Sequence, residues 1–361
     1  MKLTSLDLER FCAFKRTSLA FSPGINVLIG ANGTGKSHLM KLLYSILKAN
    51  EKAEKNDPHS PNTLTTLLAQ KLVAVFRPDS MRPEGAPKDE LGGLGRLVFR
   101  KKGRNSGHVK LASDAGKLQF TLTSLGRLKN LEDALPSGGA ALFIPSREAL
   151  AMYEGFVGNY EKRVLSFDET YYDICVALSS SPVRGPWPKE FSGLNTELET
   201  ELGGRVHEAG GRFYVYSSDG VIEAHLLAEG LRKLASLFRL LQNQSLTSNG
   251  FLFWDEPEAN LNPRLVTLIS RILRRLANAG VQVFVTTHDY LLSSELSLAA
   301  EYARQSPEDL RCEIRFFCAS RSAGGGVEIE SAATLPQLSG NPILKEFAAH
   351  YDREQSLFKG Q

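Results

Sequence analysis

INVLIGANGTGKS, residues 25–37, is the stretch that decides the fold of this chain. It begins as a short β-branched run that stops at Gly30, the pattern of a buried strand entering a turn. Its last eight residues satisfy G-x-x-x-x-G-K-[ST], and leucine and isoleucine then recur at helical spacing from Lys36 to Lys48. Strand, glycine loop and helix in this order predict a phosphate-binding P-loop.

The chemistry of phosphate binding gives each residue type in this loop a role. Glycines let the backbone approach the phosphates and turn several N–H groups inward at a helix N-terminus. The Lys36 ammonium is expected to reach the β- and γ-phosphates of ATP and to assist catalysis, and the Ser37 hydroxyl to bind Mg²⁺. The predicted nucleotide-binding residues are Gly30, Ala31, Asn32, Gly33, Thr34, Gly35, Lys36 and Ser37.

A second constellation lies in FLFWDEP, residues 251–257, where an apolar strand ends in two carboxylates. This is the Walker B arrangement, in which Asp255 would bind Mg²⁺ directly or through water. Glu256 would activate the attacking water as the catalytic base. An apolar run before Asp-Glu is by itself weak evidence for a Walker B motif. The evidence becomes strong because a P-loop precedes this run in the same chain.

The composition is that of a globular protein, with 42% hydrophobic and 23% charged residues among 361. The N-terminus, MKLTSLDLERF, carries charges where a signal peptide needs an apolar core. No apolar run approaches the length of about 20 residues that crosses a bilayer. The cysteines match no zinc-binding spacing: Cys12, Cys175, Cys312 and Cys318. We therefore expect a cytoplasmic protein with reduced thiols and no membrane partner.

The net charge of +3 does not by itself indicate a nucleic-acid-binding protein. Basic residues do gather locally, as Arg96, Arg100, Lys101, Lys102 and Arg104, and again as Arg264, Arg271, Arg274 and Arg275. Such runs are more often solvated surface charge than a binding surface. A patch that faces DNA is the alternative, and the sequence leaves it open.

The remaining pattern predicts an α/β fold with an antiparallel subdomain and an inserted helical lobe. Strands are expected at 2–9, 25–29, 72–76, 96–100, 108–112, 118–122 and 140–145, with an exposed polar connection over 49–63. Residues 147–202 appear mostly helical, with a proline-rich interruption at 179–188, and a hairpin follows around 218–220. Further elements are expected at 228–242 (helix), 251–257 (strand), 262–279 (helix) and 281–288 (strand), before a hairpin from CEIRFF and GVEIES and a helix near 341–357.

These elements suggest three parts. Residues 1–145 form an N-terminal ATPase lobe with the P-loop and an antiparallel sheet. Residues 146–225 form the inserted helical lobe and hairpin, and residues 226–361 form a C-terminal ATPase lobe. Tyr171, Tyr172 and Trp187 in the inserted lobe could form a partner-binding patch, but aromatics at such spacing more often belong to a core.

The order P-loop, long insertion, glycine-bearing helix, DEPEANLNP and TTH resembles the ABC-type ATPases of the SMC/RecF/OLD group. This resemblance covers the whole chain and implies a RecA-like P-loop core that uses ATP and Mg²⁺. Phe11 matches an aromatic of that group's N-F-R motif and is therefore a candidate nucleotide contact. Cys12 departs from the basic residue usual there, which leaves the adenosine-side contact open.

The resemblance also implies roles for residues in the second half of the chain. His288, in TTH, stands where the group places a switch histidine that hydrogen-bonds the γ-phosphate. Gly230 matches the signature-motif glycine that approaches the γ-phosphate of a second subunit, although Ala228 replaces the usual serine. An ordinary helix N-terminus is the alternative for Gly230. Residues 258–261 fall at the D-loop, and Glu148 is a candidate for the Q-loop contact to Mg²⁺.

What the chain lacks narrows the resemblance. The sequence shows no coiled-coil arms with a Cys-x-x-Cys hook and no acidic Toprim-like cluster after His288. Segments such as FIPSREAL (143–150) resemble stand-alone ATPases of bacterial defence operons, which act with a separately encoded nuclease or toxin. The resemblance therefore implies an ATP-dependent homodimer, or a higher even-numbered homo-oligomer, that switches a protein effector in anti-phage defence. A RecF-like repair or recombination ATPase on duplex DNA is the alternative function. A transporter subunit is disfavoured by the signature departure, and a non-catalytic scaffold by the intact motifs.

Overall fold

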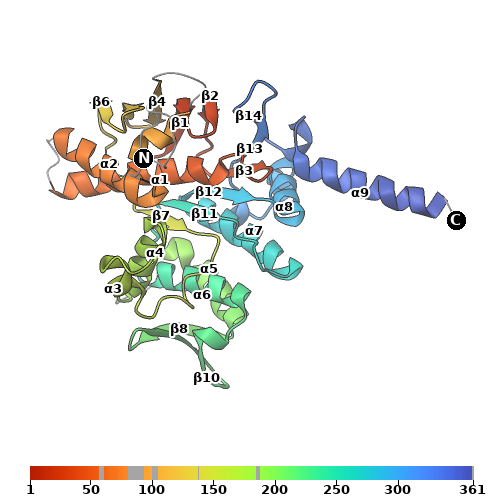
Figure 1. Ribbon diagram of the computed structural model, residues 1–361. Helices are drawn as coiled ribbons and strands as arrows, with labels where there is room; N and C mark the ends of the chain where they lie inside the picture. Colours follow the sequence, from red (N-terminus) through yellow and green to blue (C-terminus); the bar gives the residue numbers. More distant parts are fainter. Residues whose placement is uncertain (57–60, 80–92, 100–104, 137, 184–187, 360–361) are drawn as a thin grey trace.

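The computed structural model describes residues 1–56, 61–79, 93–99, 105–136, 138–183 and 188–359 (Figure 1). The helices in these ranges are α1 (Lys36–Asn56), α2 (Pro61–Phe76), α3 (Phe156–Glu161), α4 (Glu169–Ser179), α5 (Ser192–Leu202), α6 (Glu229–Gln242), α7 (Pro263–Asn278), α8 (Tyr290–Glu301) and α9 (Pro342–Lys359). The strands are β1 (Leu3–Phe11), β2 (Phe14–Ala20), β3 (Ile25–Gly30), β4 (Ser106–Ser113), β5 (Lys117–Thr123), β6 (Leu128–Glu132), β7 (Ala141–Ile144), β8 (Gly204–Ala209), β9 (Arg212–Ser217), β10 (Gly220–Glu223), β11 (Phe251–Asp255), β12 (Gln282–Thr287), β13 (Ile314–Arg321) and β14 (Val327–Ala332).

Within these ranges an 11-stranded sheet runs in the order β6-β5-β4-β1-β2-β14-β13-β3-β12-β11-β7. The strand that precedes the P-loop, β3, is parallel to both of its neighbours, β12 and β13. All residues of β3 and β12 are buried, as expected for parallel strands covered on both faces. Ile25, Val27 and Ile29 pack into one core with α6, α7 and α8, whereas Leu28 packs into a second core with α1. The sheet therefore separates two helical layers, and the P-loop leaves it from a central strand.

The other half of the sheet is antiparallel and confirms the predicted N-terminal β subdomain. Strand β1 pairs with β2 and β4, and β4 continues to β5 and β6. Burial alternates along β2 and β5, because one face of these strands packs on the core and the other meets solvent. The strands predicted at 108–112 and 118–122 lie in β4 and β5.

Two strands and one loop predicted in this region are wrong. LVAVF (72–76) ends helix α2 because Leu64, Leu68, Leu72 and Val75 are buried at helical spacing, and that period prevails over β-branched content. The polar residues 49–56 continue α1, although a connection was predicted. In the described part of RLVFR, residues 96 and 97 end a 3-10 helix (Gly93–Leu97), and Val98 then forms a single bridge to Phe11.

Some predictions fall on positions outside the described residues. These are Pro58 in the predicted connection, Arg100, Lys101, Lys102 and Arg104 of the first basic cluster, and Trp187 with its neighbours 184–186.

The inserted lobe is helical as predicted, with α3, α4 and α5 beneath the main sheet in Figure 1. A linker without helix, 162–168, separates α3 from α4. The predicted hairpin is β9–β10, and β8 adds a third strand that the sequence pattern did not reveal. Residues 224–226 are a 3-10 helix rather than strand. Tyr171 and Tyr172 are half-buried and pack against Phe167 and Tyr160, which favours the core interpretation.

The C-terminal elements follow the predicted order, and the α/β fold class is confirmed. Helix α7 begins at Pro263 because the Asn262 side chain accepts a hydrogen bond from the backbone N–H of Leu265. Helix α9 projects away from the body (Figure 1). The 11-stranded sheet takes strands from both predicted ATPase lobes, and the three-part division stays a prediction. None of the described helices is both long and apolar enough for a membrane span.

Candidate nucleotide-binding site

The loop after β3 has a backbone conformation that favours glycine at three positions. Gly30, Gly33 and Gly35 have φ angles of 144°, 73° and 85°. A Cβ atom on Gly30 would lie 2.3 Å from the carbonyl oxygen of Ala319 in the adjacent strand β13. The Thr34 hydroxyl donates to the Ala31 carbonyl at 2.8 Å and closes the turn. The fold therefore imposes the glycine pattern that phosphate binding also requires.

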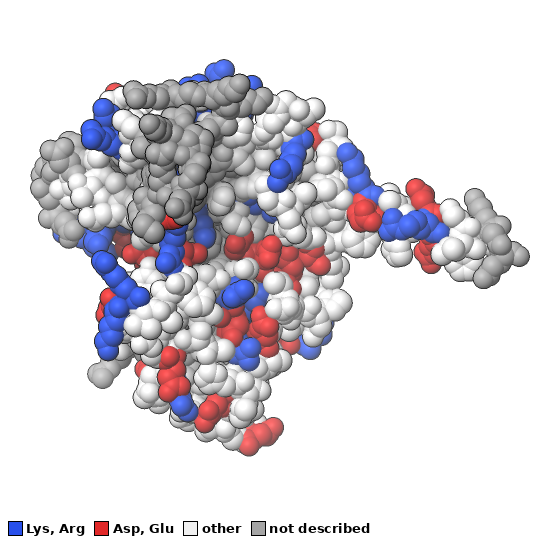
Figure 2. All heavy atoms as spheres, in the orientation of Figure 1, with Lys and Arg blue, Asp and Glu red and all other residues white. Residues whose placement is uncertain are grey.

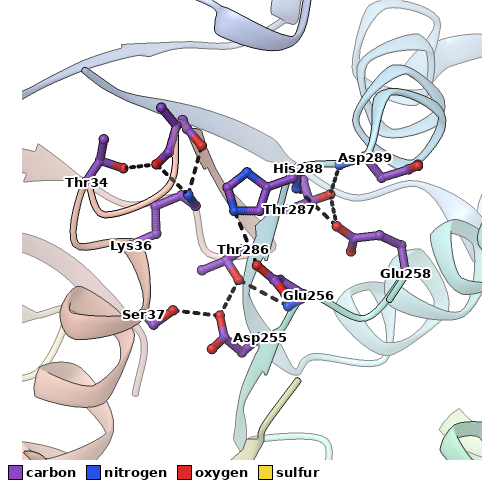
Figure 3. A network of polar contacts seen from close by, with 12 residues as sticks. Thr34, Lys36, Ser37, Asp255, Glu256, Glu258, Thr286, Thr287, His288 and Asp289 are labelled. Atoms are coloured by element: carbon purple, nitrogen blue, oxygen red, sulfur yellow. Dashed lines mark hydrogen bonds and ion pairs between the residues drawn. The ribbon is translucent and has the colours of Figure 1, made fainter. Parts of the chain in front are cut away.

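Lys36 lies inside this loop (Figure 3). Its Nζ atom donates to the carbonyl oxygens of Gly30 at 2.8 Å and Ala31 at 3.1 Å. Burial lowers the pKa of Lys36, while the carboxylates of Glu256 and Asp255 oppose that shift. The ammonium thus stands at the mouth of the loop, where a bound phosphate would replace carbonyl oxygens as its acceptor.

Asp255 joins the P-loop to the neighbouring strand. Strands β11 and β12 are parallel with Asp255 opposite Thr286, so both side chains reach the same edge of the sheet. The hydroxyls of Ser37 and Thr286 both donate to Asp255 Oδ1, the first at 3.0 Å. A carboxylate and a hydroxyl this close form the oxygen donor set that Mg²⁺ prefers, so the residues fit that ion.

Glu256 follows in a left-handed backbone conformation, with φ at 49°. Its N–H donates to the carbonyl and the hydroxyl of Thr286, at 3.2 Å and 3.1 Å. The side chain turns toward His288, whose Nε2 lies 3.2 Å from Glu256 Oε1 (Figure 3). Burial and the nearby Lys36 ammonium lower the pKa of His288, which favours a neutral imidazole. The structure thus brings the predicted base and the predicted switch histidine into contact.

Glu258 is a member of this network that sequence reasoning placed only in the D-loop. Its Oε1 accepts from the Thr287 hydroxyl at 2.6 Å and from the His288 N–H at 3.1 Å. Burial raises the pKa of Glu258. The carboxylate therefore holds the backbone that carries His288. The signal that could have identified it is the parallel pairing of β11 and β12, which brings residues just beyond the two strand ends together.

One cavity of about 650 Å³ collects the predicted catalytic groups. Its lining includes Lys36, Ser37, Glu256 and His288, together with the P-loop residues Asn32, Gly33 and Gly35. Asp255 does not line this cavity, but it accepts a hydrogen bond from Ser37, which does. Residues that directly follow β3, β11 and β12, far apart in sequence, thus converge on one cavity.

Phe11 is not among the residues that line this cavity. Its ring is completely buried and meets the ring of Phe76 edge to face, with centroids 5.9 Å apart. Cys12 and Ala13, the next residues along the turn, line the cavity instead. The arrangement does not support the expected contact of the Phe11 side chain with a nucleotide.

Gly230 lies near the start of α6 and away from the cavity of its own chain. A Cβ atom there would come within 2.7 Å of Cδ2 of Leu261 and 3.0 Å of Cδ1 of Leu265, so a larger residue would have to displace these leucine methyls. Lys233 donates to the Ala259 carbonyl at 2.6 Å, and Asn260 donates to Glu229 at 2.8 Å. The start of α6 is therefore fastened to the D-loop, and the role of Gly230 toward a second chain stays a prediction.

Glu148 forms its hydrogen bonds away from the cavity. Its Oε1 accepts from Arg232 Nε at 2.8 Å, and its Oε2 accepts from the Ala151 N–H at 3.2 Å. The side chain is 6% exposed and does not line the cavity. Its predicted contact with Mg²⁺ is not supported by this arrangement, which instead connects β7 to α6.

Two protein-family models match the chain. Residues 1–91 match the model described as an AAA ATPase domain, and residues 161–294 match the one described as an AAA domain, putative AbiEii toxin, Type IV TA system. The chain is 28% identical over 107 residues to the DNA replication and repair protein RecF of Ligilactobacillus salivarius, covering 29% of this chain and 25% of that protein. It is 35% identical over 57 residues to RecF of Staphylococcus haemolyticus, covering 16% and 15%. The matches therefore span a quarter or less of these relatives.

A solved structure shares the fold over nearly the whole chain. It is an Smc head bound to the C-winged-helix domain of ScpA, with a TM-score of 0.52 and 14% sequence identity. The similarity covers 92% of this chain and 98% of that one. At this identity the likeness concerns the fold, and it agrees with the strand order and P-loop position described above.

Proposed function

Because the chain is an ABC-type ATPase of the SMC/RecF group, we propose that it binds ATP with Mg²⁺ at residues 30–37 and hydrolyses it. The observation that carries this proposal is the convergence of five side chains on one cavity edge: Lys36, Ser37, Asp255, Glu256 and His288. Each has the chemistry that phosphoryl transfer needs, and each comes from the end of a buried strand or the helix that follows it.

In the proposed reaction the oxygen of a water molecule attacks the γ-phosphorus, and Glu256 accepts a proton from that water. The new P–O bond forms while the bond to the β–γ bridging oxygen breaks, and ADP and phosphate result. Lys36 and His288 donate hydrogen bonds to oxygens of the γ-phosphate. Ser37 and Asp255 would hold Mg²⁺, which supplies further charge neutralisation when bound.

The proposal includes a dimer in which Gly230 of each chain faces the nucleotide of the other. An exposed apolar side chain just before α6 supports a protein contact there, because Leu226 is 78% exposed. ATP held between two chains would stabilise the closed state over the open one, which is the differential affinity that a switch requires.

We further propose that the switch acts on a separately encoded effector, a nuclease or toxin, in anti-phage defence. The match to a model described as a putative AbiEii toxin of a Type IV TA system supports this context. The similar Smc head is bound to a separate protein, which supports a partner for this fold.

A second candidate is a RecF-like role on duplex DNA, favoured by the RecF relatives. In Figure 2 lysine and arginine are interspersed with acidic side chains over the described part of this face, and acidic residues gather near its middle. That distribution favours the effector hypothesis. DNA-stimulated turnover that falls steeply with salt would reverse the preference.

The decisive experiment is to compare wild type with Glu256→Gln in ATP turnover and in size by light scattering. We expect turnover to fall by about a thousandfold while the variant accumulates as an ATP-bound dimer. Glu346→Gln, on the projecting helix α9, is the matched control and should behave as wild type. Wild type without ATP turnover would refute the hydrolytic proposal, and a Glu256→Gln variant that stays monomeric with ATP would refute the dimer.

A further inference from the structure

The cavity has a second wall, built from three segments that lie far apart in the sequence. Residues 97–99 run alongside the turn between β1 and β2. The Cys12 N–H donates to the Leu97 carbonyl at 2.6 Å, and the Phe99 N–H donates to the Arg10 carbonyl at 3.0 Å. Cys12, Leu97 and Phe99 all line the cavity. Two segments separated by α1 and α2 thus form one continuous surface.

The turn between β13 and β14 completes this wall. The Val327 N–H donates to the Ala13 carbonyl at 2.9 Å, and Gly326 has a φ angle of 94°. A Cβ atom on Gly326 would lie 3.6 Å from Cζ of Phe99, so the turn packs close to that ring. Gly326 and Val327 also line the cavity. The Phe99 ring is therefore backed by ordered backbone.

This wall begins where the P-loop ends. A Cβ atom on Gly35 would lie 3.5 Å from the Cβ atom of Ala13, so the start of α1 abuts the wall. The lining of the same cavity also includes Glu256 and His288. Phosphates held by the P-loop amides and Lys36 would leave the nucleoside to extend toward this wall, where apolar side chains lie beside Arg96 and Arg321 in the cavity lining.

We propose that Phe99, with Leu97, Cys12 and Val327 beside it, binds the base of the nucleotide. This inference rests on the proposed ATP binding at residues 30–37. An aromatic face offers stacking to a base, and the flanking apolar groups exclude water from it. Phe99 takes the place for which the sequence favoured Phe11, whose ring is sealed inside the core.

Calorimetric titration of the full chain with ATP and with inorganic tripolyphosphate tests the inference. Phe99→Ala should weaken ATP binding by about tenfold and leave tripolyphosphate binding within about twofold of wild type. Phe99→Trp should retain ATP binding, because it keeps an aromatic face. Phe347→Ala, an aromatic truncation on the projecting helix α9, is the control and should change neither affinity.

The outcomes distinguish a failure of this inference from a failure of the proposed ATP binding. Unchanged ATP binding by Phe99→Ala would overturn the inference alone, and so would equal losses for ATP and tripolyphosphate, which would mean that Phe99 shapes the P-loop. A wild-type chain that binds neither ligand would overturn the proposed ATP binding and the inference with it. Weakened ATP binding with retained tripolyphosphate binding supports both.

Discussion

The two sides of the nucleotide cavity are built in different ways. The phosphate side consists of polar side chains at the ends of β3, β11 and β12, joined by hydrogen bonds through Asp255, Thr286 and Glu258. The nucleoside side carries the apolar side chains of Cys12, Phe99 and Val327, and its segments are joined by backbone hydrogen bonds, from Cys12 to Leu97 and from Val327 to Ala13. One side thus depends on residue chemistry, and the other on how distant backbones are brought together.

This difference predicts that substitutions on the phosphate side change binding of any polyphosphate, whereas those on the nucleoside side discriminate between ATP and tripolyphosphate. The contrast can be tested by variants that act on one side only.

The largest effect on binding is expected from Lys36→Ala. Loss of a charge-assisted hydrogen bond to phosphate should weaken ATP and tripolyphosphate alike, by about a hundredfold. Lys41→Ala, one turn further along α1 and paired with Asp168, provides the matched control. Calorimetry with both ligands measures the effect. If Lys36→Ala lost affinity for ATP but not for tripolyphosphate, the division between the two sides would be wrong.

A smaller effect is expected from Thr287→Val, an isosteric change that removes the donor to Glu258 and the acceptor of the Asp289 N–H. The side chain is completely buried, so the lost bonds should lower the free energy of unfolding by ~2 kcal/mol. The backbone of His288 loses part of its support, and turnover should fall by about tenfold with ATP affinity unchanged. Denaturant melts and steady-state kinetics measure the two quantities. Thr267→Val, on the exposed face of α7, is the control, and equal kinetics for both variants would remove Glu258 from the positioning network.

On the nucleoside side, Val327→Ala should have a modest effect. The change removes two methyl groups from the cavity wall, which should weaken ATP binding by about three- to fivefold and leave tripolyphosphate binding unchanged. Competition titrations measure the ratio of the two affinities. Val73→Ala, at a half-exposed position on α2, controls for the loss of methyl groups. A parallel loss for both ligands would show that the wall also supports the P-loop.

The smallest expected effect is on how the free energy of unfolding changes with pH. Burial raises the pKa of Glu258 above 4.5, its value in the unfolded chain, so the folded state holds this proton to a higher pH than the unfolded state does. Stability contributed by the protonated form is present below pH 4.5 and is lost as pH rises through the folded pKa. Glu258→Gln should therefore lose less stability than wild type as pH rises from 4 toward neutrality. Parallel curves from urea melts across that range would contradict the raised pKa.

The phosphate side was largely predictable from sequence, because strand ends and glycine loops are local patterns. Lys36, Ser37, Asp255, Glu256 and His288 were named from motifs, and the structure brings all of them together. The contacts of Glu258 were not predicted, because they are made with Thr287 and His288 at the end of the neighbouring strand β12. The order of the central elements was predictable for the same reason, since each strand and helix there has a clear period.

The nucleoside side was predicted poorly, because the local motif there pointed to Phe11 and the rest of the wall comes from distant segments. Residues 96–100 have a β-branched and aromatic composition that indicates a strand, but residues 96 and 97 end a 3-10 helix and residue 98 forms a single bridge to Phe11. Phe11 was favoured by a motif position, yet its ring turns into the core and meets Phe76 on α2. The run 72–76 was misassigned to a strand, so the helix that receives Phe11 was not anticipated. Pairing across such sequence distances is a property of the tertiary fold.

Strand β3 has a consequence for how the molecule opens and closes in solution. It is hydrogen-bonded along both edges and buried along its whole length. Its amide protons should therefore be among the slowest in the chain to exchange with deuterium, whereas those of the projecting helix α9 should exchange early. The loop at Gly30 is thus tethered to the most persistent part of the protein. Partial opening at the periphery would leave the phosphate side assembled, so nucleotide could stay bound while outer elements rearrange.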